Sequence, residues 1–130
     1  MVLPAVLATI GFGVAGDVAV VASLVAHVCA EQTRVRTAAQ RMEAASAQVA
    51  MTLPLLPASA VRTRGIDGSL DRLNQLAPLR KPLVIRAFVV AAVDGEGVLS
   101  LAGADLLRAV CAALDAPMPP LVEAVYLDPR

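Results

Sequence analysis

Three carboxylates near residue 100 carry the side-chain type that binds divalent cations. They are Asp94, Glu96 and Asp105. An EF-hand calcium loop places oxygen ligands at its first, third, fifth and twelfth positions and glycine at its sixth. Counted from Asp94, the fifth residue is Val98 and the sixth is Leu99, so the match is poor. We predict no metal site and keep the three acids as weak candidates for a cation-responsive loop.

The corner between two helices explains the same acidic turn better. Gly95 and Gly97 tolerate a positive φ angle or a close backbone approach, and Ser100 is a good N-cap for the helix that follows. We therefore predict a helical hairpin around Asp94–Ser100.

The remaining reactive side chains form no recognisable catalytic pattern. His27 is the only histidine, which excludes a two-histidine metal motif. A catalytic triad would have to use His27 as its base. Cys29 and Cys111 lie among apolar neighbours and are predicted to be buried free thiols. The chain has no glycine-rich nucleotide motif and a single lysine, Lys81. We predict no catalytic residue, no cofactor and no enzymatic activity.

Three arginines are clustered in the first half of the chain, between Glu31 and Glu43: Arg34, Arg36 and Arg41. The flanking acids favour a solvated helix face, with an anion-binding patch as the alternative. The net charge is 0, with 11 basic and 11 acidic side chains, so nothing argues for a nucleic-acid partner.

Composition indicates helices packed through small aliphatic side chains. Hydrophobic residues make up 58% of the 130 residues and aromatic residues 2%, and much of the apolar content is alanine. A chain of this length holds one core. We predict a single all-α domain over 1–130, built as a compact bundle of about five helices, with surplus apolar helix faces that bind a protein partner or a second copy.

Residues 2–30 contain one formal charge, Asp17, and leave two interpretations open. The first is a short helix around Pro4–Ile10, a break at the glycines of residues 11–16, and a helix capped by Asp17. The second is a membrane segment, which the length permits and the central carboxylate disfavours.

The chain divides into an N-terminal helical region over 1–53, a proline-containing linker over 54–65, a helical region over 66–121 and a tail over 122–130. In the first region, a helix from Asp17 to near Ala50 either bends or continues through Glu31–Val35. In the third, Asp67 or Ser69 caps a helix with Leu70, Leu73 and Leu76 on one side. Its second helix either starts near Leu79 or is kinked in its first turns by Pro82. Residues 83–93 of that helix are apolar apart from Arg86, which predicts a central helix, with a β-strand as the alternative.

After the hairpin turn, a helix from Leu101 to about Leu114 buries its inward leucines and Val110, and the proline-rich stretch from Pro117 ends it.

Residues 69–121 resemble the C-terminal, TerB-like helical module of bacterial membrane zinc metalloproteases of the CAAX-prenyl-protease type. The resemblance is carried by the leucines of the first helix with Pro78, by Glu96–Gly97, by the run Asp105–Val110 and by Pro117–Leu121. Residues 17–57 are similar to the upstream segment of those proteases more loosely.

This resemblance implies an accessory helical part without hydrolytic activity, because the zinc motif of the family lies in a region that this chain lacks. It also implies a cytoplasmic location, free or at the inner face of the membrane. One departure matters: Gly103 stands where the family has the first acid of a glutamate pair, which puts any cation role in doubt.

Overall fold

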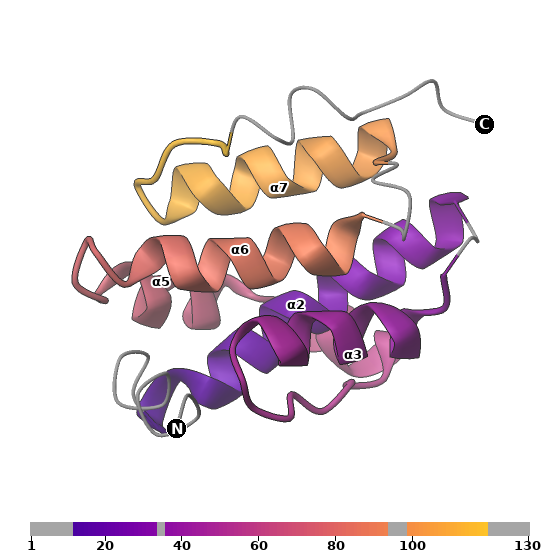
Figure 1. Cartoon of the computed structure of the whole chain (residues 1–130), viewed down its shortest axis with the longest axis horizontal. Coiled ribbons are helices and arrows are strands. Elements are labelled where there is room, and N and C mark those ends of the chain that lie inside the picture. Colours follow the sequence, from indigo (N-terminus) through magenta and orange to yellow (C-terminus); the bar gives the residue numbers. More distant parts are fainter. Residues whose placement is uncertain (1–11, 34–35, 94–98, 120–130) are drawn as a thin grey trace.

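The computed structural model describes residues 12–33, 36–93 and 99–119, and it confirms an all-α bundle. The described residues form six helices, one more than predicted (Figure 1). Their bounds are α2 Phe12–Thr33, α3 Ala38–Gln48, α4 Ala58–Arg64, α5 Asp67–Asn74, α6 Lys81–Ala92 and α7 Leu101–Ala113. The short helix predicted at Pro4–Ile10 lies outside the described residues.

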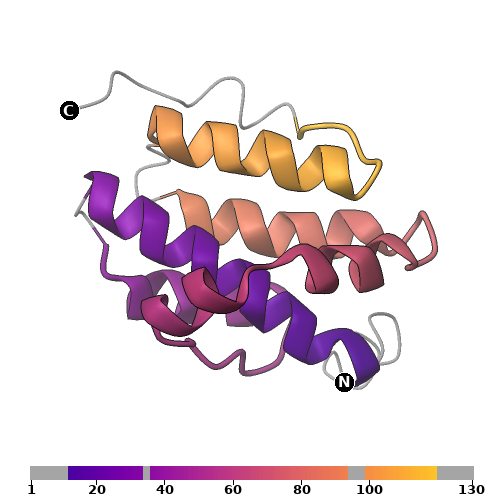
Figure 2. The ribbon, with the colours of Figure 1, turned by 180° about the vertical axis from the view of Figure 1, so that it is seen from behind.

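Helix α2 is the centre of the bundle, since it packs against all five other described helices (Figures 1 and 2). The stripe that faces them includes Val18, Val21, Val25 and Cys29, all fully or almost fully buried. These apolar spacings of three and four residues are what a helix needs to bury one face. Burial on several sides explains the nearly continuous apolar run of this segment.

The predicted glycine break and the Asp17 cap are both wrong. Helix α2 begins at Phe12 and continues through Gly13 and Gly16, so Asp17 lies inside the helix rather than at its start. Each glycine costs about 1 kcal/mol relative to alanine in a helix interior. Packing of α2 on its neighbours offsets that cost, because tertiary contacts provide most helix stability in proteins.

Helices α2 and α3 are separate, which resolves the choice left open at Glu31–Val35. Helix α2 ends at Thr33, and α3 begins after Thr37. The Thr37 hydroxyl accepts from the Gln40 N–H, and the Gln40 side chain accepts from the Thr37 N–H, at 3.1 and 2.9 Å. This reciprocal capping box defines the start of α3.

The segment predicted as a linker contains α4 and is held against α2. Val61 of α4 is buried, and the two side chains Ser23 and His27 of α2 bind the preceding backbone. Ser23 accepts the Leu56 N–H at 3.0 Å, while His27 Nε2 donates to the Leu56 carbonyl at 2.7 Å. Polar contacts from the central helix therefore fix the course of this segment.

Helix α5 starts without either predicted cap. Its N-cap is Ile66, with no side-chain hydrogen bond, and Asp67 occupies the first turn, where a carboxylate favours the positive end of the helix dipole. Ser69 instead points into the bundle. The predicted apolar side is confirmed: Leu73 is fully buried, and Leu70 and Leu76 pack against the core.

Helices α6 and α7 form the predicted hairpin and lie antiparallel, side by side (Figure 1). Pro82 falls in the first turn of α6, where its missing N–H costs little. Ser100 caps α7 as predicted and accepts the Gly103 N–H at 3.0 Å. Residues 94–98 of the corner lie outside the described residues.

Gly103 lies where α7 crosses α2. A Cβ atom at this position would stand 2.8 Å from Cys29 Sγ and 3.1 Å from Leu99 Cδ1. The close approach of the two helices therefore leaves no room for a side chain at Gly103.

No helix in the described ranges is long and apolar enough to cross a membrane. Residues 2–11 of the alternative membrane segment lie outside those ranges.

Candidate functional site

The weak metal candidates are not assembled into a site by the part of the chain that is described. Asp105 is exposed on α7 and accepts from Arg108 Nη1 at 2.9 Å, one turn along the same helix. Asp94 and Glu96 lie outside the described residues. Within those residues, no group of three histidine, cysteine, aspartate or glutamate side chains could hold a metal ion.

Both thiols are buried, as predicted, and neither forms a disulfide within the described ranges. Burial raises the pKa of Cys29 from 9.0 to about 11, outweighing the opposite effect of nearby Arg41. Burial also raises the pKa of Cys111. Both groups are therefore neutral thiols near pH 7, which makes them poor nucleophiles and poor metal ligands.

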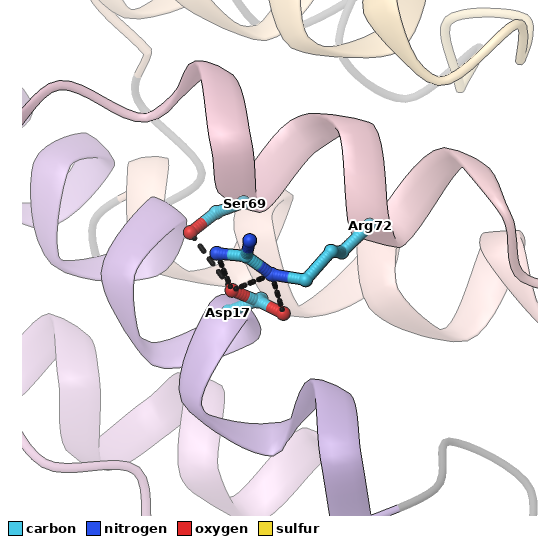
Figure 3. Close-up of polar contacts among 3 residues, drawn as sticks. All are labelled: Asp17, Ser69 and Arg72. Atoms are coloured by element: carbon cyan, nitrogen blue, oxygen red, sulfur yellow. Dashed lines mark hydrogen bonds and ion pairs between the residues drawn. The ribbon is translucent and has the colours of Figure 1, made fainter.

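A polar cluster at Asp17 joins α2 to α5 (Figure 3). The Asp17 carboxylate is 7% exposed and accepts from the Ser69 hydroxyl at 3.0 Å. Arg72 places Nε 2.9 and 3.0 Å from the two carboxylate oxygens, and its Nη2 lies 2.8 Å from one of them. The hydrogen bonds and charge of Asp17 raise the pKa of Arg72.

A partly open cavity of about 450 Å³ lies beside this cluster, between α2, α5 and the segment before α4. The ionic groups that reach it are oppositely charged and bonded to each other, so they offer little net charge to a ligand. A hydroxyl–histidine–carboxylate triad is not formed here. His27 lies ten residues from Asp17 along α2, a rise of about 15 Å, and binds the Leu56 carbonyl. We interpret the cluster as an anchor between helices.

Arg41 corrects the prediction of a solvated arginine face. Its side chain is 0% exposed and lies between α3 and the end of α6. Nη1 donates to the carbonyls of Ala91 and Ala92 at 3.2 and 2.6 Å, and Nε donates to the Arg36 carbonyl at 3.3 Å. The last carbonyls of a helix lack partners within that helix, so Arg41 closes the end of α6. Arg34 lies outside the described residues.

An apolar groove runs between the first half of α6 and the segment that follows α7. Its floor contains the buried side chains of Ile85 and Val89, and it has a volume of about 390 Å³. The described residues that line it are Pro82, Ile85, Arg86, Val89 and residues 116–119. Pockets that bind ligands are mostly apolar, measure ~300–1,000 Å³ and carry a few polar groups, so the groove has suitable size and chemistry.

The wall at 116–119 is positioned by the end of α7. Asp115 has a φ of 52°, and the N–H of Ala116 donates to the Cys111 carbonyl at 2.9 Å. The Asp115 N–H donates to the Ala112 carbonyl, which completes a Schellman motif and reverses the chain.

Lys81, the first residue of α6, connects this wall to the rest of the bundle. Its Nζ donates to the Leu114 carbonyl at 2.8 Å and to Asn74 Oδ1 at 2.7 Å. The ammonium group thus binds the C-terminal carbonyls of α7, where a cation is favoured. These contacts fix both sides of the groove before any ligand binds.

Arg86 is the single charged side chain among the described residues that line the groove. It is exposed and forms no hydrogen bond or ion pair with the described residues, unlike Arg41 and Arg72. A cation at the edge of an apolar surface is suited to a carboxylate on a binding partner.

Two cations of this site stand out in the sequence by their rarity. Arg86 is the lone charge between residues 83 and 93, and Lys81 is the only lysine. The prolines at 117 and 119 prevent the helix from continuing, and they also line the groove. Nothing in the residue pattern joins α6 to 116–119, because the Schellman turn at Asp115 uses no glycine.

No protein-family model, curated protein or solved structure matches the chain in the three comparisons.

Proposed function

We propose that this chain is a non-catalytic helical interaction domain. Its binding surface is the apolar groove between α6 and residues 116–119. The observation that carries the proposal is an exposed cation, Arg86, which pairs with no described residue and lies beside a preformed apolar floor. The occupant is a partner segment that inserts aliphatic or aromatic side chains over Ile85 and Val89 and directs a carboxylate toward Arg86.

The chemistry of the groove supports a peptide segment over a small polar substrate. Apolar contact area provides affinity, and one charge gives orientation and selectivity. Lys81 and the Schellman motif hold the wall in place, so the entropic cost of ordering the site on binding is small. The charged groups of the interior, Asp17 and Arg41, are already bonded within the bundle and are buried.

The resemblance of residues 69–121 to the TerB-like module of membrane zinc metalloproteases supports an accessory role. We propose that the chain acts by contact beside such a catalytic part, in the cytoplasm or at the inner face of the membrane. The partner segment would then belong to the associated enzyme or to another protein that it recruits.

Selection from a random peptide library displayed on phage tests the proposal with the full-length chain immobilised. We expect enrichment of peptides with two or more apolar residues near an aspartate or glutamate. The Arg86→Glu variant should exchange that acid for lysine or arginine, because the cation that orients the peptide has changed sign.

Arg108→Glu is the matched control, since Arg108 is an exposed arginine on α7 that does not line the groove. It should leave the selected peptides unchanged. Absence of enrichment, or peptides that are the same for the wild type and Arg86→Glu, would contradict the groove as the binding surface.

A further inference from the structure

We propose that residues 121–128 of this chain occupy the groove when no partner is bound. The inference rests on the groove being the binding surface proposed above. It adds regulation: a partner must displace a segment of the same chain. Residues 121–128 lie outside the described residues, and the case for them comes from their position in the chain and their chemistry.

Position is the first argument. Pro119 lines the groove, and residues 121–128 follow it after a single further proline. Eight residues can span up to ~26–29 Å, so the segment can turn back over α6. Tethering through a short connection gives a segment an effective concentration in the millimolar range, so even a weak contact is populated.

Chemical complementarity is the second argument. The segment reads Leu-Val-Glu-Ala-Val-Tyr-Leu-Asp, with apolar residues around two carboxylates. The groove offers an apolar floor and one cation that has no ion pair with the described residues, Arg86. Glu123 and Asp128 therefore supply the charge that the groove lacks, and Val125 or Tyr126 between them supplies the apolar group.

Competition with a partner follows from this arrangement. The apparent affinity of the groove for a partner equals its intrinsic affinity multiplied by the fraction of molecules in which the groove is free. Any event that removes the segment, such as proteolysis or binding elsewhere, would increase partner binding without changing the bundle.

Tyrosine fluorescence of the full-length chain tests the inference directly. The chain contains one tyrosine, Tyr126, and no tryptophan, so the emission reports on the proposed segment alone. Docking in more than half of the molecules should lower the acrylamide quenching constant about twofold relative to the chain unfolded in urea. Arg86→Glu should return the constant to the unfolded value, and Arg108→Glu should not.

Charge exchange gives a second test that does not depend on the stability of one variant. Glu123→Lys with Asp128→Lys should also expose Tyr126, and combining both changes with Arg86→Glu should restore protection. Protection that is unaffected by any of these changes, or no protection in the wild type, would overturn the inference.

Dilution separates this chain's own segment from that of a second copy. The quenching constant should be independent of protein concentration for intramolecular docking, whereas protection lost on dilution would assign the segment to another molecule and overturn the inference. Failure of the two proposals is distinguishable. Exposed Tyr126 together with selected acidic peptides would remove the tail contact and leave the interaction domain intact.

Discussion

Two arginines in apolar surroundings show how the bundle differs from its binding surface. Arg41 is fully buried, and its guanidinium binds carbonyls at the ends of neighbouring segments. Arg86 is exposed at the groove and binds no described residue. A buried charge must be paired to be tolerated, whereas an exposed unpaired charge costs the fold almost nothing.

This difference separates the polar groups that stabilise the fold from those that are accessible to a ligand. Asp17, Ser69 and Arg72 belong with Arg41, since they bind each other and join α2 to α5. The groove differs from these clusters because its floor is apolar and its cation, Arg86, is exposed and binds no described residue. Substitutions at both kinds of site, and a change of pH, test that separation.

Replacement of Arg41 by alanine should be the most damaging change. It removes the donors that satisfy the carbonyls of Ala91 and Ala92 and leaves a cavity in their place. We expect the free energy of unfolding to fall by about 3–5 kcal/mol, measured by urea denaturation with circular dichroism. Arg36→Ala is the control and should change stability by less than about 0.5 kcal/mol. Equal effects would contradict an anchoring role.

Alkaline pH should weaken the bundle through Cys29. Its thiol ionises near 9.0 when unfolded but only at about 11 in the bundle. The stability that this difference contributes is complete below pH 9 and is lost as the pH rises through about 11. The loss reaches about 2–3 kcal/mol. Urea midpoints at several pH values measure it, and Cys29→Ala should flatten the slope. An unchanged slope in that variant would refute the assignment.

Asp17→Asn should cost about 1–3 kcal/mol, because the buried amide cannot provide the two charged acceptors that Arg72 and Ser69 use. Thermal unfolding followed by circular dichroism provides the measurement. Asp71→Asn, at an exposed position on α5, should remain within about 0.5 kcal/mol of the wild type. Similar melting of all three proteins would show that the cluster is not an anchor.

Gly103→Ala should cost about 1–2 kcal/mol, because overpacking against Cys29 exceeds the gain in helix propensity. Cys29→Ala in the same chain should recover part of the loss, which a double-mutant cycle measures. Gly68→Ala is the matched control: its Cβ would meet only the flexible Arg72 side chain at 3.6 Å, so stability should stay equal or rise. A neutral Gly103→Ala would contradict the close crossing.

Arg86→Gln should have the smallest effect on folding, within about 0.5 kcal/mol, because no described residue depends on the side chain. The same variant should lose binding of acidic peptides selected on the wild type. A loss of stability comparable to that of Arg41→Ala would instead place Arg86 among the structural charges.

Local pattern was sufficient for much of the fold. Ser100 before an apolar run predicted the start of α7, and the spacing of Leu70, Leu73 and Leu76 predicted the buried side of α5. Both features depend on neighbours within a few residues. The antiparallel hairpin of α6 and α7 followed from two apolar helices separated by a short glycine turn.

Long-range contacts overruled local pattern elsewhere. Asp17 had the residue type of a cap, and the ion pair with Arg72, 55 residues away, placed it inside α2 instead. Arg41 lay between acids and was predicted to be solvated, but its partners are at the end of α6. The groove joins α6 to residues beyond α7, and the turn that brings them together uses Asp115 rather than glycine.

The most direct test of the central claim is a titration of the isotope-labelled full-length chain with a library-selected acidic peptide, followed by backbone amide NMR. We expect shifts concentrated at Ile85, Arg86, Val89 and Met118, and none at the anchor of Asp17, Ser69 and Arg72. Shifts centred on that anchor, with the groove residues unchanged, would contradict it.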